Sequence, residues 1–158
     1  MGIKFKEMTT VFIGLGSNIG NRMHYLHLAR EGLSNIFNAK HTSSIIESAP
    51  LYVTDQPAFL NQVISGETSL SITDLFNYIT QLQKEIGRTL TYKNGPREID
   101  IDILYYGNTI MDTPDITVPH PRINERLFVL EPICEIAPDW LCPITKKTMR
   151  ELLLIHSS

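Results

Sequence analysis

The chain contains 158 residues, a length that favours one domain spanning residues 1–158 around a buried core. Its composition, with 42% hydrophobic and 20% charged residues, is ordinary for a globular protein and excludes disorder over most of the length. The net charge of −3 gives the whole molecule no attraction for nucleic acid, and no apolar run is long enough for a membrane helix. Neither cysteine belongs to a Cys-x-x-Cys pair, and no signal-peptide core is present, so we expect a cytoplasmic protein.

Hydrophobic periodicity predicts the elements of the first half of the chain. An apolar run predicts a buried strand at residues 10–15, and apolar residues at every third or fourth position predict a helix over 23–36. Weaker alternation predicts a second strand at 42–48. A loop at 50–57 then leads to a third strand at 59–68.

A second helix and a fourth strand follow. Ser71 and Asp74 resemble a capping box at the start of the helix, and Gly87 is suited to end it. The next strand begins near Ile99 and ends near Gly107. The order strand, helix, strand, strand, helix, strand is the split βαβ pattern. It predicts an α+β, ferredoxin-like βαββαβ sandwich with both helices against one face of a mostly antiparallel sheet.

The remainder of the chain has a weaker pattern. Residues 112–121 are predicted to form a proline-rich connector, residues 122–131 a helix and residues 132–143 a loop. No internal repeat, low-complexity tract or linker indicates a second domain.

The most informative stretch alternates isoleucine with aspartate. Ile99, Ile101 and Ile103 face a core in this pattern, while Asp100 and Asp102 share the opposite face of the strand. The two aspartate Cα atoms are expected roughly 6.7 Å apart, which lets both carboxylates bind one divalent cation or two neighbouring ones. Two like charges on one face destabilise a sheet, and a bound metal removes that cost. An amphipathic strand with an acidic solvent face shows the same alternation.

Basic residues precede this strand. Arg88, Lys93 and Arg97 lie in a segment that is broken by Asn-Gly-Pro. Ordinary surface turns also carry lysine and arginine. The position of these residues beside two carboxylates nevertheless favours a functional role over that of an ordinary surface turn. Cationic side chains next to a carboxylate pair indicate a metal-bridged polyanion, such as a nucleoside triphosphate with Mg²⁺.

Other residues suit the same chemistry. Phe59 and Asn61 share one face of a predicted strand, where they could stack on and hydrogen-bond a flat heterocycle, although a core phenylalanine beside an edge asparagine fits equally. His120, Arg122 and Arg126 add three potential phosphate donors to an acidic chain.

Two familiar site patterns do not fit. The glycine-rich turn at residues 14–20 has neither dinucleotide-binding nor P-loop spacing, although its backbone N–H groups could still face a ligand. A zinc site made of Cys134 and Cys142 with His120 or His156 is not supported by the spacing.

The segment Gly95-Pro-Arg-x-x-Asp-x-Asp-Ile-Leu resembles the signature of the 6-hydroxymethyl-7,8-dihydropterin pyrophosphokinase family, which are enzymes of folate biosynthesis. Pieces similar to other parts of that family occur in the family's order over nearly the whole chain. They are Gly16-Ser-Asn, Asp55-Gln-Pro-x-Phe-Leu-Asn61, Gly87-Arg88, Val118-Pro-His-Pro-Arg122, Glu125-Arg-x-Phe-Val-Leu130 and Glu135-Ile-Ala-Pro-Asp139.

The resemblance implies transfer of pyrophosphate from ATP to the hydroxyl of 6-hydroxymethyl-7,8-dihydropterin, with release of AMP, on a ferredoxin-like fold. By the same resemblance Asp100 and Asp102 hold two Mg²⁺ ions that bridge the ATP phosphates and the substrate hydroxyl. Arg88 and Arg97 join them as catalytic residues. Ile103 and Thr117 line the adenine and ribose pocket. The ATP-binding residues that the resemblance implies are Arg88, Arg97, Ile103, Thr117, His120 and Arg126.

The resemblance also implies that the pterin ring lies between Phe59 and Phe128, with its guanidine-like edge on Asn61. The implied pterin-binding residues are Ser48, Ala49, Pro50, Leu51, Gln56, Phe59, Asn61 and Phe128. Phosphoryl-type transfer needs positioning and charge neutralisation more than covalent help, so we assign no strong general base. Loops at 50–57 and 89–96 are expected to close over ATP and exclude water.

Two alternatives remain at this point. A ferredoxin-like module that binds a small regulatory ligand without catalysis does not need Asp100 and Asp102 beside Arg97. A different metal-dependent nucleotidyl transferase does not need aromatic residues around a flat ligand. We expect a monomer whose partners are ATP and the pterin, with no nucleic acid and no membrane.

Overall fold

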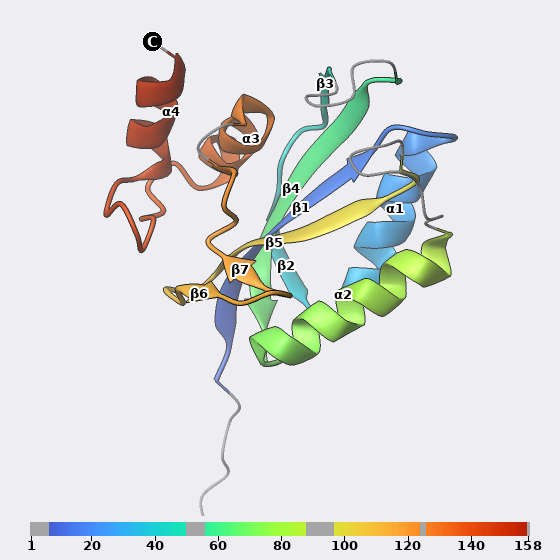
Figure 1. The fold of residues 1–158 in the computed structure, drawn as a ribbon, viewed down its shortest axis with the longest axis horizontal. Helices are drawn as coiled ribbons and strands as arrows, with labels where there is room; N and C mark the ends of the chain where they lie inside the picture. The colour runs from blue at the N-terminus through green and yellow to red at the C-terminus, as the bar shows by residue number, and fades with distance from the viewer. Residues whose placement is uncertain (1–6, 50–55, 88–96, 124–125, 158) are drawn as a thin grey trace, which may run out of the picture.

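The computed structural model describes residues 7–49, 56–87, 97–123 and 126–157. Within these residues an antiparallel sheet carries helices on both faces (Figure 1), which confirms the predicted α+β class. The elements in chain order are β1 (Thr9–Ser17), α1 (Arg22–Leu33), β2 (Asn38–Thr42), β3 (Ile46–Ser48), β4 (Phe59–Thr68), α2 (Ile72–Ile86), β5 (Asp100–Tyr106), β6 (Met111–Asp112), β7 (Thr117–Val118), α3 (Leu127–Ile136) and α4 (Met149–Ser157).

The main sheet has the strand order β2–β4–β1–β5, and β3 also pairs with β4. The long strand β1 lies between β4 and β5 and runs antiparallel to both. In this register Gly16 lies opposite Asn61 on one side and opposite Asp100 on the other. The end of β1 therefore brings two candidate site residues from distant parts of the sequence onto neighbouring strands.

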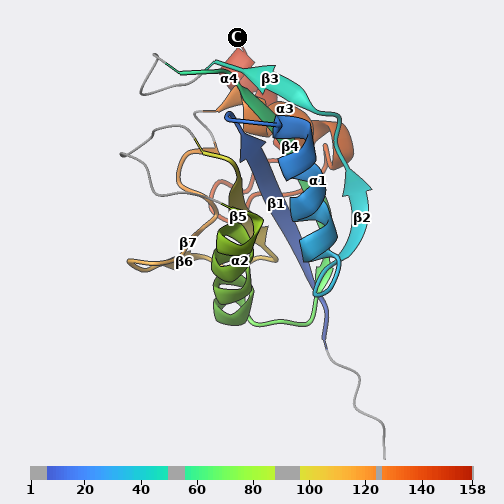
Figure 2. The same cartoon turned by 90° about the vertical axis from the view of Figure 1, so that its right-hand side faces the viewer.

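Helices α1 and α2 cover one face of the sheet (Figures 1 and 2). Val11 and Ile13 of β1 point toward this face and are fully buried with Leu26 of α1 and Leu75 of α2. Burial of each such side chain contributes about 1.5–3 kcal/mol to the hydrophobic stabilisation. The apolar stripes seen in the sequence are thus the core-facing sides of both helices.

Polar caps and a glycine define the ends of these helices. Asn21 Oδ1 accepts a hydrogen bond of 3.2 Å from the His24 N–H at the start of α1. Ser71 Oγ accepts one of 3.1 Å from the Asp74 N–H at the start of α2, as predicted. Gly87 ends α2 with φ = 116°, a left-handed conformation that favours glycine.

Helices α3 and α4 lie on the opposite face, where they form a second core. Phe12 and Leu104 from the sheet pack there with Leu130 and Ile133 of α3 and Met149 of α4. The prediction of helices on one face is correct for α1 and α2, but it is incomplete because this second layer covers the other face. None of the described helices is long and apolar enough to cross a membrane.

A bulge in β5 lets one strand serve both cores. Tyr105 lies opposite Phe12, and Ile103 lies opposite Ile13, so Leu104 is the additional residue. Ile103 faces the first core, whereas Leu104 and Tyr105 are both buried in the second. The bulge therefore interrupts the alternation directly after the aspartate segment.

The predicted strand at 42–48 is wrong in its bounds, because β2 and β3 are separate and β2 begins at Asn38. The break is at Ser43. Its N–H donates to the Val63 carbonyl at 2.9 Å, and its Oγ accepts from the Val63 N–H at 2.9 Å. The serine side chain replaces a backbone partner, so the edge of the sheet stays hydrogen-bonded across the break.

The C-terminal third also differs from the prediction. The helix predicted at 122–131 is α3, which begins at Leu127 and runs to Ile136, so the predicted loop at 132–143 is wrong over its first residues. Pro132 is inside this helix and does not end it. The predicted connector at 112–121 overlaps the β6–β7 hairpin, whose first residue is Met111, and α4 was not predicted.

Candidate active site

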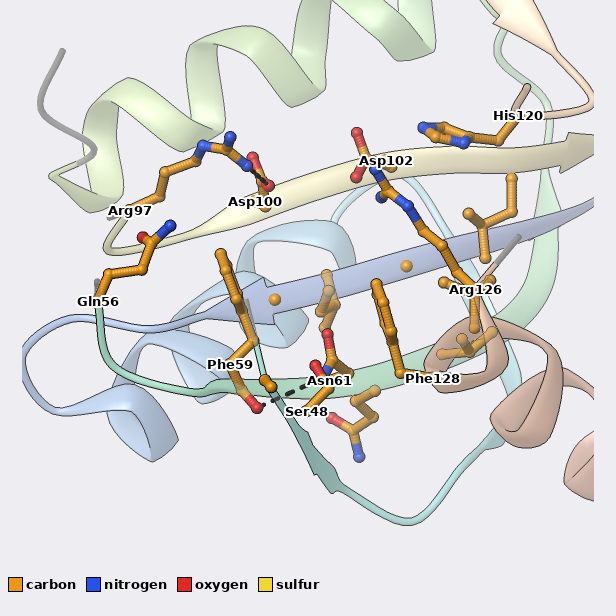
Figure 3. Close-up of a pocket in the computed structure, with 18 residues that line it drawn as sticks. Ser48, Gln56, Phe59, Asn61, Arg97, Asp100, Asp102, His120, Arg126 and Phe128 are labelled. Carbon is orange, nitrogen blue, oxygen red and sulfur yellow. Dashed lines mark hydrogen bonds and ion pairs between the residues drawn. The ribbon is translucent and has the colours of Figure 1, made fainter. Parts of the chain in front are cut away.

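Asp100 and Asp102 extend from one face of β5 (Figure 3). Both are partly exposed, whereas Ile101 and Ile103 are 4% and 8% exposed in the first core. The alternation in the sequence therefore does separate a buried apolar face from an acidic face that is open to a pocket. Two carboxylates on one face of a strand present several oxygen ligands to a hard cation.

A glycine lies opposite each of the two carboxylates. Gly16 of β1 pairs with Asp100, and Gly14 pairs with Asp102. Both glycines line the same pocket as the aspartates. Because neither has a side chain, the floor of the pocket beside the carboxylates stays open. The sequence carried this signal as a glycine repeat with the period of a strand, but we did not predict these two residues as part of the site.

Arg97 forms an ion pair with Asp100 at the entrance to β5. Both side chains are 21% exposed, so the pair is only partly screened by water. A guanidinium in this position neutralises one carboxylate and still has donors for a second anion. The predicted grouping of an arginine with the aspartate pair is therefore present.

Two aromatic rings form a slot over the same face of the sheet. Phe59 is the first residue of β4, and Phe128 lies in the first turn of α3. Figure 3 shows the two rings facing each other across a gap, with Asn61 at its base. A gap between two aromatic faces accepts a flat ring system.

Asn61 is held in place by the strand next to it. It is 7% exposed, and its Nδ2 donates to Ser48 Oγ at 2.7 Å. Its Oδ1 faces β1, where a Cβ added to Gly16 would lie 3.7 Å away. The amide is therefore fixed at the base of the slot, where it can exchange hydrogen bonds with the edge of a bound heterocycle.

A second cavity of about 510 Å³ lies on the other side of β5, between α2 and the segment around β7. Ile103 and Thr117, two of the predicted site residues, line it. Asp100, Asp102 and His120 line both this cavity and the first pocket. The carboxylate pair is thus shared by two pockets, an arrangement suited to a reaction between two bound molecules.

His120 is a neutral hydrogen-bond donor at this junction. Burial, the largest cause, and the charges of Arg126 and Arg122 together lower its pKa to about 4, against a smaller opposing effect of Asp100. Its Nδ1 accepts from the Arg122 N–H at 3.3 Å, which leaves the proton on Nε2. The backbone N–H of His120 donates to the Leu104 carbonyl at 2.9 Å and so ties the residue to β5.

Arg126 connects the aromatic slot to the acidic face. Its guanidinium lies over the Phe128 ring at 5.6 Å from the centroid, a cation–π contact. Figure 3 shows the same group extending toward Asp102. Arg126 therefore presents positive charge where the two pockets meet.

Asn18 holds together two segments that line the site. It is fully buried, and its Oδ1 accepts from the Arg97 N–H at 2.8 Å. Its Nδ2 donates to Gln56 Oε1 at 2.8 Å and to the Pro57 carbonyl at 3.1 Å. We did not predict this role for Asn18, because its partners are 79 and 38 positions away in the sequence.

Gln83 lies beside the site but was not among the predicted site residues. It is 8% exposed, and its Oε1 accepts from the Ile101 N–H at 2.8 Å. Ile101 lies between the two aspartates on an edge strand, so this bond fixes the backbone that carries them. Gln83 also lines the second cavity.

The predicted site residues fall into three groups. The first pocket is lined by Ser48, Ala49, Gln56, Phe59, Asn61, Arg97, Asp100, Asp102, His120, Arg126 and Phe128. Ile103 and Thr117 line the second cavity and not the first. Pro50, Leu51, Arg88 and most of the two predicted closing loops lie outside the described residues.

The chemistry of the two carboxylates fits Mg²⁺. Among the described residues no cluster of three or more histidine, cysteine, aspartate or glutamate side chains could hold a metal ion by itself. Mg²⁺ commonly takes one or two carboxylates from the protein and completes its octahedral shell with phosphate oxygens and water. The two carboxylates of Asp100 and Asp102 therefore match the number of protein ligands that Mg²⁺ commonly takes.

Comparison with known proteins agrees with this site. The model of the family described as 7,8-dihydro-6-hydroxymethylpterin-pyrophosphokinase (HPPK) matches residues 12–138. A 2-amino-4-hydroxy-6-hydroxymethyldihydropteridine pyrophosphokinase of Aquifex aeolicus (strain VF5) is 40% identical over 144 residues, which cover 91% of this chain and 90% of that protein.

Longer relatives contain a similar segment. The folic acid synthesis protein fol1 of Pneumocystis carinii is 42% identical over 136 residues, or 85% of this chain, which spans only 18% of that protein. A crystal structure of Plasmodium falciparum HPPK-DHPS, wild type, superposes with a TM-score of 0.77 at 12% identity over 98% of this chain and 46% of that one, so it shows a shared fold. The family match over residues 12–138 and the Aquifex relative confirm the predicted resemblance: the chain belongs to the 7,8-dihydro-6-hydroxymethylpterin-pyrophosphokinase family.

Proposed function

We propose that this chain transfers the pyrophosphoryl group of ATP to the hydroxyl of 6-hydroxymethyl-7,8-dihydropterin, giving AMP and the pterin diphosphate, in folate biosynthesis. Family membership supports this activity. The structural observation that carries the proposal is that two pockets share Asp100, Asp102 and His120. Such an arrangement holds two substrates on either side of one charged centre.

The aromatic slot is the proposed pterin site. A pterin is flat, and stacking between Phe59 and Phe128 buries both of its faces. Its edge carries an amide and an amino group, which match the amide of Asn61 at the base of the slot. Ser48, Ala49 and Gln56 line the same pocket, and the resemblance extends the set to Pro50 and Leu51.

The second cavity is the proposed site for adenosine. Ile103 contributes an apolar wall, and Thr117 contributes a hydroxyl to the lining of the same cavity. The triphosphate then runs past Asp100 and Asp102 toward the first pocket. Phosphate contacts are proposed for Arg97, His120 and Arg126, all of which line that pocket, and for Arg88 by resemblance.

Asp100 and Asp102 are the proposed ligands of two Mg²⁺ ions. When bound, these ions neutralise the phosphate charge and lower the pKa of the attacking hydroxyl. The aspartates orient the cations between the two pockets, and Arg97 adds a fixed positive charge beside Asp100. The relative positions of the two cavities determine the direction from which the pterin hydroxyl approaches the ATP phosphates.

In the reaction a bond forms between the pterin hydroxymethyl oxygen and the β-phosphorus of ATP. The hydroxyl releases its proton to water, the bond from that phosphorus to the oxygen of the α-phosphate breaks, and AMP leaves. The stacked ring holds the hydroxyl in line, the arginines stabilise the charge on the transferred group, and the neutral imidazole of His120 donates from Nε2 to a phosphate oxygen. No residue of the chain is required as a strong general base.

Several coarser properties complete the proposal. A ferredoxin-like fold is supported by the strand order β2–β4–β1–β5, with α1 after β1 and α2 after β4. We further propose one domain over residues 1–158, a monomer, and a cytoplasmic location.

A product assay tests the activity. Purified protein is mixed with ATP, Mg²⁺ and 6-hydroxymethyl-7,8-dihydropterin, and the nucleotide products are separated by chromatography. AMP that forms only when the pterin is present supports the proposal. ADP in place of AMP would indicate an ordinary kinase, and pyrophosphate release with nucleotide incorporation would indicate a nucleotidyl transferase.

A further inference from the structure

The two rings of the aromatic slot belong to independent elements. Phe59 is on β4, while Phe128 is carried by α3. Helix α3 rests on the sheet through buried apolar residues, chiefly Leu130 and Ile133. The hydrophobic effect is not directional, so a polar contact with defined geometry adds to what fixes the position of the helix along its axis. The width of the slot needs a directed contact as well.

Glu135 provides such a contact. Its two carboxylate oxygens each lie 3.1 Å from the backbone N–H of Ser44, and Oε2 accepts from Ser44 Oγ at 2.8 Å. The two residues are 91 positions apart in the sequence. Hydrogen bonds to a charged acceptor are stronger and more strictly oriented than those between neutral groups.

Ser44 is itself fixed relative to β4. The preceding residue, Ser43, exchanges two hydrogen bonds of 2.9 Å with Val63. Its carbonyl also accepts from Gln62 Nε2 at 2.9 Å. Both partners follow Asn61 directly on β4, the strand that also carries Phe59. The Glu135 carboxylate therefore joins α3 to the strand that forms the other side of the slot.

Within α3, Glu135 and Phe128 are about two turns apart, and residues at this spacing lie on the same side of a helix. Pro132 lies between them and has no N–H to donate to the Phe128 carbonyl, four residues earlier. The first turn therefore has one hydrogen bond fewer to the rest of the helix. Its placement depends on how firmly the second half of α3 is held.

We propose that Glu135 is a positioning residue for the pterin slot, because its bonds to Ser44 set the distance between Phe128 and Phe59. The inference rests on the proposed function of the slot. Glu135 does not line either pocket, so it acts only through the placement of α3. Loss of the carboxylate leaves both rings present but incorrectly spaced.

Steady-state kinetics of Glu135→Ala test this role. The KM for 6-hydroxymethyl-7,8-dihydropterin is expected to rise about 10-fold or more, because a misplacement of about 1 Å is costly to a stacked ligand. The KM for ATP is expected to stay within about twofold, because the second cavity does not involve α3. Glu131→Ala is the matched control: it removes an exposed glutamate of the same helix and should leave both KM values unchanged.

Milder variants keep the test valid if Glu135→Ala folds poorly. Glu135→Gln keeps one oxygen acceptor and should give a smaller rise in pterin KM, and Ser44→Ala, which removes only the hydroxyl donor, about a threefold rise. In the double variant Glu135→Ala with Ser44→Ala, the KM should equal that of Glu135→Ala alone, because the two side chains act through one contact.

Two results would overturn the inference. One is a lower melting temperature in Glu135→Ala with an unchanged pterin KM, which describes a purely structural residue. The other is an equal rise in both KM values. Phe128→Ala separates this failure from failure of the proposed function: if Phe128→Ala also leaves pterin KM unchanged, the slot does not bind the pterin.

Discussion

Asp100 and Gly16 lie directly opposite each other on β5 and β1. The same glycine lies opposite Asn61 on its other side, so one residue without a side chain separates the acidic face from the base of the aromatic slot. A Cβ on Gly16 would lie 3.5 Å from a ring carbon of Phe59, an ordinary contact distance. Further atoms beyond that Cβ would occupy the slot itself.

We therefore predict that Gly16→Val raises the KM for the pterin by about 10-fold or more, while Gly16→Ala raises it only slightly. A γ-methyl must enter the space between the rings, whereas a single methyl meets Phe59 at van der Waals distance. Steady-state kinetics with each substrate varied in turn provide the measurement. An unchanged pterin KM in the valine variant would place the ligand elsewhere.

Asn18→Ala should weaken both the fold and the site. The substitution leaves the part-buried N–H of Arg97 and the carboxamide of Gln56 without their Asn18 partner, which costs about 2 kcal/mol in the free energy of unfolding. The value of kcat/KM should fall about 10-fold or more, because two segments that line the site lose their common anchor.

Asn21→Ala is the control for Asn18→Ala, because it removes another asparagine from the same turn. Asn21 caps α1, so its loss should cost about 1 kcal/mol and leave kcat/KM unchanged. Urea denaturation and steady-state kinetics measure the two effects. A similar loss of activity in both variants would show that stability alone is responsible.

His120 should make the free energy of unfolding fall in acid. Its pKa is about 4 in the folded chain and near 6.5 when unfolded, so the unfolded state binds more protons between these values. Stability from this residue is complete above pH 6.5 and is lost as the pH falls toward 4. Between pH 7.5 and pH 4.5 the chain should lose about 2 kcal/mol more than His120→Gln. Urea denaturation at a series of pH values measures the free energy of unfolding of both proteins. The same pH dependence in the unchanged chain and in His120→Gln would refute this prediction.

Arg97→Ala should slow turnover far more than it weakens pterin binding. The guanidinium lies beside Asp100, where charge on the transferred group develops, and not within the ring slot. Removal of one such donor typically lowers kcat by about 100-fold or more. Single-turnover rates and pterin titrations give the two quantities separately. Equal losses in rate and affinity would assign Arg97 to ground-state binding.

Local patterns predicted the parts of the fold that depend on neighbouring residues. The alternation around Asp100 and the caps of α2 at Ser71 and Gly87 involve partners within a few positions, and the structure contains them as expected. The strand β4 also has its predicted bounds. In these elements the signals lie within each segment itself, so the sequence alone was sufficient.

The errors have tertiary causes. The sequence predicts a loop from Pro132, yet the buried contacts of Leu130 and Ile133 keep α3 helical through this residue. Ser43 breaks the second strand but replaces the missing backbone partner with its own hydroxyl. Neither effect can be predicted from the residues that are adjacent in the sequence.

The candidate site divides in the same way. Its charged face was predictable because Asp100 and Asp102 are two positions apart, and side chains at this spacing lie on the same face of a strand. The anchoring residues Asn18 and Gln83 were not, because each acts on a segment that only the folded chain brings close. The glycine floor was visible as a repeat, but its pairing with the aspartates depends on the register of β1 and β5.

The rate of AMP formation in Asp100→Asn and Asp102→Asn tests the account most directly. Each amide keeps the shape of the side chain but removes the charge proposed to bind Mg²⁺, and Asp74→Asn in the exposed first turn of α2 is the control. At saturating ATP, Mg²⁺ and pterin, we predict a fall of about 1,000-fold or more in both site variants, with little change in the control. AMP formation at an undiminished rate in either site variant would contradict the proposal that these carboxylates hold the catalytic metal ions.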